Sequence, residues 1–156
     1  MVKDQPRASG MIVLAADGKK AVAMEVTDRE VRLFEPEDGL LVRTNHFFHP
    51  DLREITTTPE ESPSSYARHA RATELLKQRH GSIGLHDILR ILSDHTPLTG
   101  PLACQRISDD SICRHGDGDL TARTCGAVIN CPEDHVTWGL LGNPCEGIQA
   151  LGRPEE

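Results

Sequence analysis

The stretch LLVRTNHFFHPDL, residues 40–52, changes character along its length. Leu40, Leu41 and Val42 form the kind of apolar run that a buried strand needs. An asparagine, two histidines and two phenylalanines then follow within a few positions. The stretch therefore predicts a strand that either ends in an ordinary loop or presents the rim of a site at Asn45 and His46.

The residues before this stretch read as further short strands separated by turns. Asp17-Gly18, Thr27-Asp28 and Glu37-Asp38-Gly39 are turn sequences of the kind that join antiparallel strands. Short connections of this kind favour an antiparallel meander. Four strands are expected: MIVLAA (11–16), AVAMEV (21–26), VRLFE (31–35) and LLVRT (40–44).

The middle of the chain has helical patterns. Ser62-Pro63 is a suitable start for a helix that continues to a stop at Gly81. A second, amphipathic helix is indicated by Leu85, Ile88, Leu89 and Leu92, because these apolar residues recur at the spacing of one helix face.

The last third returns to strand patterns, which we expect at SICRH (111–115), LTARTCGAVINC (120–131) and HVTWGLLG (135–142). Hairpins at both ends and helices between them are typical of an α+β fold with helices on one face of a sheet. The length of 156 residues fits one domain, residues 1–156, with a core of its own.

The charge balance excludes two classes of partner. Acidic residues number 24 against 17 basic ones, which gives a net charge of -7. Nucleic acid and anionic membranes both require a concentrated basic surface, so we expect neither as a partner. No apolar run is long enough for a membrane span, and the start MVKDQPR is not a signal peptide, so a cytoplasmic location is expected.

The five cysteines, all from position 104 onward, give no metal-binding pattern. A structural zinc site usually shows paired short spacings such as C-x-x-C, which this chain lacks. The sequence therefore predicts reduced thiols, no metal and no cofactor, with a metal-binding protein that uses these late cysteines as the remote alternative.

Several motifs occur in a specific order: LVRTNHF, a helix opening SSYAR, a helix ending LSDH, then SICRH, TARTCGAVI and WGLLGNPC. Together they cover nearly all of residues 9–146 and resemble the C-terminal part of the acyl-coenzyme A:6-aminopenicillanic-acid acyltransferase family. Members of that family are autoproteolytic N-terminal-nucleophile hydrolases and acyltransferases. The resemblance implies a sandwich of helices, two stacked antiparallel sheets and helices (αββα), of which the N-terminal half is missing here.

The resemblance also implies site residues. Asn45 of TNHF matches an asparagine that donates a hydrogen bond to the oxyanion, and Arg123 of TARTCGAV matches an arginine that supports the site. A fixed asparagine N–H suits an oxyanion hole because it is a preorganised donor that carries no charge. The alternatives are that Asn45 only caps the following loop and that Arg123 is an outward residue of an alternating strand.

Thr44, His46 and Phe47 beside Asn45 are expected to bind a small acyl or amide substrate. Each has an alternative, since His46 can brace the loop and Phe47 can close the core. Ser65 and Arg68 match the family's helix opening as a hydrogen-bonding residue and a packing or ion-pairing arginine.

The catalytic cysteine of the family becomes N-terminal by self-cleavage at a Gly–Cys bond, and its own amine serves as its base. This sequence has no Gly–Cys bond, and its first cysteine is Cys104. We therefore expect a piece of a cysteine-dependent acyltransferase or amidohydrolase that acts on amide C–N bonds through a thioester and is inactive alone. A complementary N-terminal chain or self-association is expected, since a halved sandwich exposes strand edges. The alternative is a non-catalytic interaction module or relic.

Overall fold

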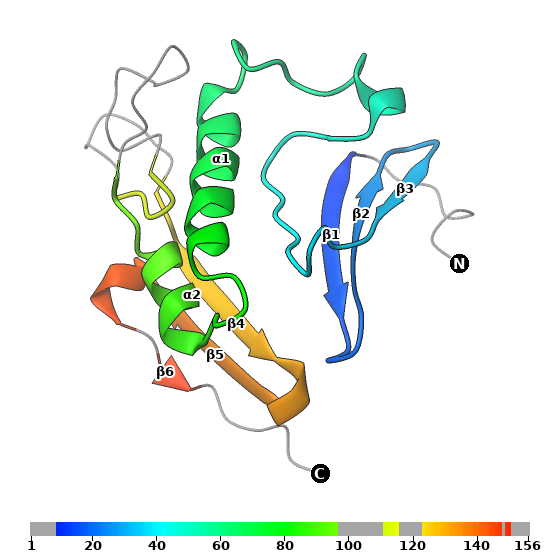
Figure 1. Ribbon diagram of the computed structural model, residues 1–156. Helices are drawn as coiled ribbons and strands as arrows, with labels where there is room; N and C mark the ends of the chain where they lie inside the picture. The colour runs from blue at the N-terminus through cyan, green and yellow to red at the C-terminus, as the bar shows by residue number, and fades with distance from the viewer. Residues whose placement is uncertain (1–8, 97–110, 116–122, 148, 151–156) are drawn as a thin grey trace.

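The computed structural model describes residues 9–96, 111–115, 123–147 and 149–150. It has an α+β fold of two helices and two small antiparallel sheets, as the sequence predicts (Figure 1). The helices are α1 (Pro63–Gln78) and α2 (Leu85–Leu92). The strands are β1 (Met11–Ala16), β2 (Ala21–Val26), β3 (Val31–Phe34), β4 (Gly126–Cys131), β5 (Val136–Leu141) and β6 (Gln149–Ala150).

The first sheet has the order β1-β2-β3, and its two hairpins follow the predicted turns. Gly18 adopts a φ of 82°, and the Asp17 carboxylate accepts hydrogen bonds from the N–H groups of Lys19 and Lys20. At the second turn, Thr27 Oγ1 accepts from the N–H of Glu30 at 2.9 Å. Turn residues of this kind bond their own backbone, which fixes the register of the strands they join.

The predicted fourth strand, residues 40–44, does not form. Glu37 and Leu40 make an isolated bridge around a turn in which Asp38 and Gly39 both have positive φ, and residues 41–44 join no ladder in the described structure. The Arg43 guanidinium instead lies over the rings of Phe34 and Phe48, at 4.2 and 4.7 Å from their centroids. These cation–π contacts hold the segment beside the end of β3 instead of along it.

The second sheet has the order β4-β5-β6. Its long strand was predicted over 120–131, of which residues 120–122 lie outside the described ranges. Residues 123–125 join no ladder, and the strand spans Gly126–Cys131. The predicted strand 111–115 is a series of bends, because its backbone bonds go to separate partners. Cys113 N–H donates to Asp94 O at 3.0 Å, and Arg114 N–H donates to Thr124 Oγ1 at 3.0 Å.

Both helices are confirmed near their predicted bounds. Ser62 is the N-cap of α1 and Pro63 its first residue, and Gly81 beyond its end has a φ of 80°. Positive φ favours glycine because it has no Cβ. None of the helices in the described ranges is long and apolar enough to cross a membrane.

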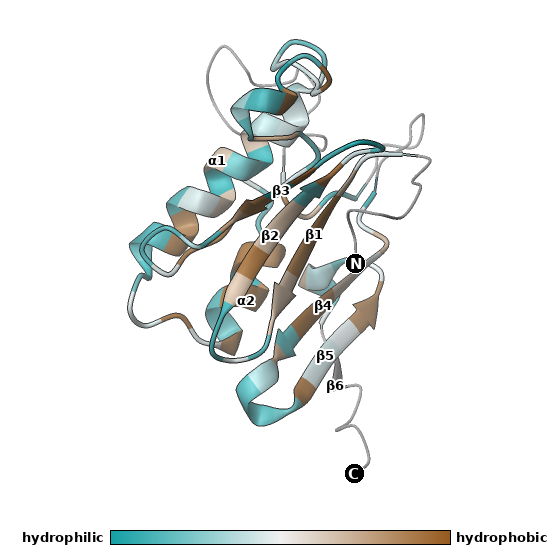
Figure 2. Ribbon diagram, turned by 90° about the vertical axis from the view of Figure 1, so that its right-hand side faces the viewer, coloured by the Kyte–Doolittle hydropathy of each residue, from teal (hydrophilic) through white to brown (hydrophobic). Residues whose placement is uncertain are grey.

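The buried apolar side chains are few and come from every part of the fold. The described core comprises Ala23, Val26, Leu52, Ala67, Ile91, Cys113 and Ile129. A Cβ atom on Gly18 would lie 3.1 Å from Cγ of Glu133, so the two hairpin ends meet. Hydrophobic residues run along β1 and β2 in Figure 2. Leu14, Leu33, Val128 and Leu141 of the two sheets are exposed.

Candidate active site

The loop after residue 44 borders a pocket of about 430 Å³. Its walls come from the start of β1, from the loop itself and from residues 55–57. All four residues that the sequence analysis assigned at this loop line it together. The lining residues are Gly10, Met11, Ile12, Thr44, Asn45, His46, Phe47, Ile55, Thr56 and Thr57.

Asn45 is exposed at this pocket, and two residues of α1 hold it. Its backbone N–H donates to Ser65 Oγ at 2.8 Å, and its side-chain Oδ1 accepts from Arg68 Nη2 at 2.8 Å. Among the described residues its Nδ2 group has no hydrogen-bond partner. Because a cation engages the oxygen, the free end of the amide is its N–H donor.

His46 follows Asn45 in the loop and is only 4% exposed. Its Nδ1 lies 2.8 Å from Ser65 Oγ, and its ring stacks on Tyr66 with centroids 3.6 Å apart. Tyr66 in turn donates its hydroxyl to Thr57 O at 2.7 Å. His46 thus packs against α1, and Tyr66 of the same helix binds the opposite wall at Thr57, so His46 has the geometry of a loop brace.

Burial, followed by the charge of His69 and of two nearby arginines, lowers the pKa of His46 from 6.5 to about 4. Between these values the unfolded chain binds a proton at residue 46 that the folded chain excludes. The free energy of unfolding should therefore fall as the pH drops from 6.5 towards 4, and it should be fully retained above this window.

Urea denaturation across this pH range measures the effect. In His46→Gln the slope should shrink, leaving the part due to His69, whose pKa burial also lowers. The exposed His86 offers a control, since His86→Gln should keep the full slope. An unchanged slope in His46→Gln would show that His46 titrates normally in the fold.

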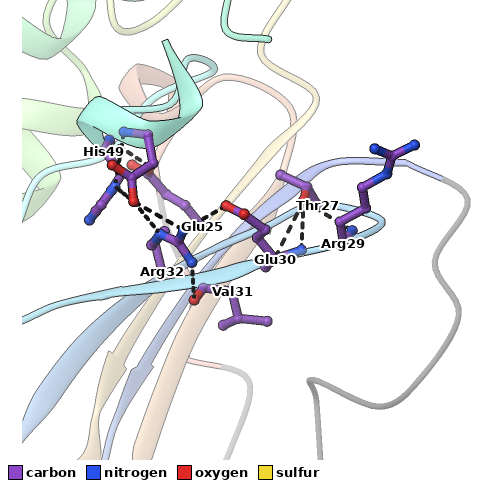
Figure 3. Close-up of polar contacts among 8 residues, drawn as sticks. Glu25, Thr27, Arg29, Glu30, Val31, Arg32 and His49 are labelled. Atoms are coloured by element: carbon purple, nitrogen blue, oxygen red, sulfur yellow. Dashed lines mark hydrogen bonds and ion pairs between the residues drawn. The ribbon is translucent and has the colours of Figure 1, made fainter. Parts of the chain in front are cut away.

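A buried carboxylate anchors the second half of the loop. Glu25 of β2 is 0% exposed, and its two oxygens accept from the backbone N–H groups of Phe48 at 2.8 Å and His49 at 2.9 Å. Arg43 Nε lies 3.6 Å from Glu25 Oε1. In Figure 3 the side chains of Glu25 and Arg32 point from the first sheet toward the loop at His49. The first sheet thus fixes the loop on the side opposite α1.

Two arginines meet at Ser64, and one of them, Arg68, contacts Asn45. Arg68 Nε donates to Ser64 Oγ at 3.3 Å, and Arg114 Nη2 also donates to Ser64 Oγ. Burial, and then the charge of Arg114, lower the pKa of Arg68 to about 10, so the Arg68 guanidinium remains charged at neutral pH. The sequence indicated an ion-pairing or packing role for Arg68 but gave no sign of Arg114, because the contact spans 50 positions.

The structure places Arg123 elsewhere. It is exposed in the segment ahead of β4, and it does not line the Asn45 pocket. Phe47 lies at the pocket, where its ring tip would approach a Cβ on Gly10 to 2.8 Å. Thr44 is half-buried, with its hydroxyl 3.3 Å from His46 Nδ1. The four predicted loop residues are thus brought together, and Arg123 is not among them.

A comparison with protein families decides the relationship. The sequence model of the acyl-coenzyme A:6-aminopenicillanic acid acyl-transferase family matches residues 1–110 of the 156 in the chain. The chain belongs to this family. The match to the acyl-transferase family includes the first sheet, the Asn45 pocket and both helices, whereas Arg123 lies beyond it. No curated protein matches the chain.

Proposed function

We propose that the chain is the oxyanion-binding portion of a cysteine-dependent acyltransferase or amidohydrolase that acts on amide bonds. The observation that carries this proposal is the hydrogen bond from Arg68 to Asn45 Oδ1, at 2.8 Å, in the family-matched part of the chain. With Oδ1 engaged, the Nδ2 group of Asn45 is left as the available donor of a fixed amide. Such donors stabilise the negative charge that develops on a carbonyl oxygen during acyl transfer.

The nucleophile in this proposal is a cysteine outside residues 1–156, because none of the five cysteines follows a glycine. Its sulfur attacks the carbonyl, the tetrahedral oxyanion forms opposite Asn45, and its collapse expels the amine and leaves a thioester. The free α-amine of that cysteine takes up the thiol proton and delivers it to the leaving amine. Water or another amine then releases the acyl group.

The arginines near Asn45 supply electrostatic support. Arg68 contacts Asn45 Oδ1, and Arg114 meets Arg68 at Ser64 Oγ. Positive charge at this point favours negative charge at the donor end of the amide. Arg123 remains a candidate for longer-range support from its exposed position. Thr44 and Phe47 are proposed to contact the acyl group, and buried His46 to hold the loop in place.

The missing nucleophile also suggests how the fold is completed. We propose that residues 41–44, which join no ladder in the described structure, pair with a strand of the cysteine-bearing segment. Exposed apolar residues such as Leu14 and Leu33 would be covered in the resulting αββα sandwich. Alone, the chain is expected to self-associate through these edges.

Acyl trapping tests the proposal. The chain is coexpressed with a cysteine-led N-terminal portion and incubated with a panel of simple acyl thioesters. Intact-mass measurement should show one acyl group on the N-terminal cysteine, which hydroxylamine removes. The control replaces that cysteine with serine and should take up no acyl group that hydroxylamine releases. A stable complex that never acquires an acyl group would contradict the proposal and favour a non-catalytic module.

A further inference from the structure

Two cysteines and two histidines from distant segments converge on one point outside the Asn45 pocket. His95 follows α2, Cys113 and His115 flank Arg114, and Cys145 lies in the short helix η3 (Pro144–Glu146). The helix α2 packs against η3 (Figure 1). One ligand atom from each of the four side chains lies within 4.8 Å of all the others.

The separations of these atoms are short and similar. The two sulfur atoms lie 3.8 Å apart, and the two Nε2 atoms lie 3.0 Å apart. His115 Nε2 lies 3.8 Å from Cys113 Sγ and 3.2 Å from Cys145 Sγ. The four atoms therefore surround a common centre, and none of them is a distant neighbour of a single close pair.

These separations match a tetrahedral zinc site. Zn–S bonds of about 2.3 Å and Zn–N bonds of about 2.0 Å put two sulfurs about 3.8 Å apart, two nitrogens about 3.3 Å apart and mixed pairs about 3.5 Å apart. We propose that His95, Cys113, His115 and Cys145 bind one Zn²⁺ ion. Four protein ligands fill the coordination shell, so the site is structural and holds no water for catalysis.

The surroundings of Cys113 suit a metal-bound thiolate. Asn143 Nδ2 donates to Cys113 Sγ at 3.4 Å and to Arg114 O at 2.6 Å, which fixes the donor against the sulfur. Hydrogen bonds of this kind orient metal ligands and stabilise their charge. Two thiolates and two neutral imidazoles also balance the charge of Zn²⁺. The buried Cys113 thiolate would therefore belong to a site with no net charge.

The ligand segments are held in place without a metal. Asp94, next to His95, receives two hydrogen bonds from Arg71 of α1, at 3.1 and 2.9 Å. The carbonyl of Asp94 accepts from Cys113 N–H at 3.0 Å. Preorganised ligands lose less conformational entropy when the metal binds. A bound zinc would join the end of α2, residues 111–115 and η3, and so position Arg114 between its two flanking ligands.

The sequence did not point to this site, and we expected no metal from the spacing of its residues. Zinc motifs are read from pairs a few positions apart, such as C-x-x-C. Here only Cys113 and His115 are close in sequence, and the other two ligands lie 18 positions before and 30 positions after them. A Cys–His nucleophile pair would need only one sulfur, which leaves the second cysteine and the second histidine unexplained.

Cobalt binding tests the site. Co²⁺ reports its own coordination by visible absorption, with a thiolate-to-cobalt charge-transfer band in the near ultraviolet. The reduced full chain should bind one equivalent of Co²⁺ with tetrahedral absorption and a charge-transfer band, and Zn²⁺ should bleach both. In Cys145→Ser the charge-transfer band should drop by half and Co²⁺ affinity should fall more than about 100-fold, beyond the loss for an outer-shell partner.

Cys125 provides the matched control, since it is exposed and outside the cluster, and Cys125→Ser should bind cobalt like the original chain. Cys145 is exposed as well, so its replacement should leave the fold intact, which circular dichroism verifies. Zn²⁺ should raise the unfolding temperature of the original chain and not that of Cys145→Ser. Equal cobalt binding by both chains, octahedral cobalt spectra, or a Cys113–Cys145 disulfide in protein from cells would overturn the proposal.

Discussion

Asn45→Ala should lower kcat of the complete enzyme about 100- to 1000-fold, which is the usual loss for one oxyanion-hole donor. The Nδ2 group of Asn45 has no partner among the described residues, while Arg68 occupies Oδ1. KM should change little, because the oxyanion exists only in the transition state and the intermediate. Steady-state kinetics with an amide substrate or an acyl thioester measures both constants.

Two further variants separate chemistry from structure. Asn45→Asp keeps an acceptor for Arg68 but removes the N–H donor, so it should be as inactive as Asn45→Ala. Asn130 of β4 bonds Thr137 at the surface away from the pocket, and Asn130→Ala should retain full activity. Full activity of Asn45→Asp would show that Asn45 does not donate to the oxyanion.

Glu25→Ala should destabilise the fold by about 3–5 kcal/mol, the range for breaking a buried ion pair by removing one partner. The replacement leaves the N–H groups of Phe48 and His49 without acceptors, and it leaves Arg43 beside a cavity instead of a carboxylate. Burial lowers the pKa of Arg43, which means that the fold already spends free energy to keep this guanidinium charged. The loop that carries Asn45 should also become more mobile in this variant.

Urea denaturation at neutral pH gives the free energy of unfolding. Glu35 lies just beyond β3 and is exposed, so Glu35→Ala serves as the control and should change the stability by less than about 0.5 kcal/mol. A loss of less than about 1 kcal/mol in Glu25→Ala would show that the carboxylate does not anchor the loop.

Local patterns in the sequence predicted the parts of the fold that depend on neighbours in the chain. The turn residues Asp17-Gly18 and Thr27-Asp28 bond their own backbone, so both hairpins follow from local chemistry. The start of α1 at Ser62-Pro63 is local for the same reason. The four loop residues 44–47 line one pocket together because they are consecutive, whereas the walls from β1 and residues 55–57 were not predicted.

Features that depend on distant partners were not predictable. The expected strand at residues 40–44 is apolar enough, but Arg43 packs on two aromatic rings and no neighbouring strand offers a ladder in the described ranges. The link from Arg68 to Asn45 spans 23 positions, and Arg114 reaches Ser64 across 50. Convergence of His95 with Cys145 likewise requires the fold itself.

The most direct test is to purify the protein from its native host and to determine the N-terminal residue of every polypeptide in it by mass spectrometry. We predict that this chain is either the C-terminal part of a polypeptide that begins with cysteine or bound to such a polypeptide. Reaction of that cysteine with a thiol-directed acylating probe would identify it as the nucleophile. A preparation in which the chain begins at Met1 or Val2 and no bound polypeptide begins with cysteine would contradict the account.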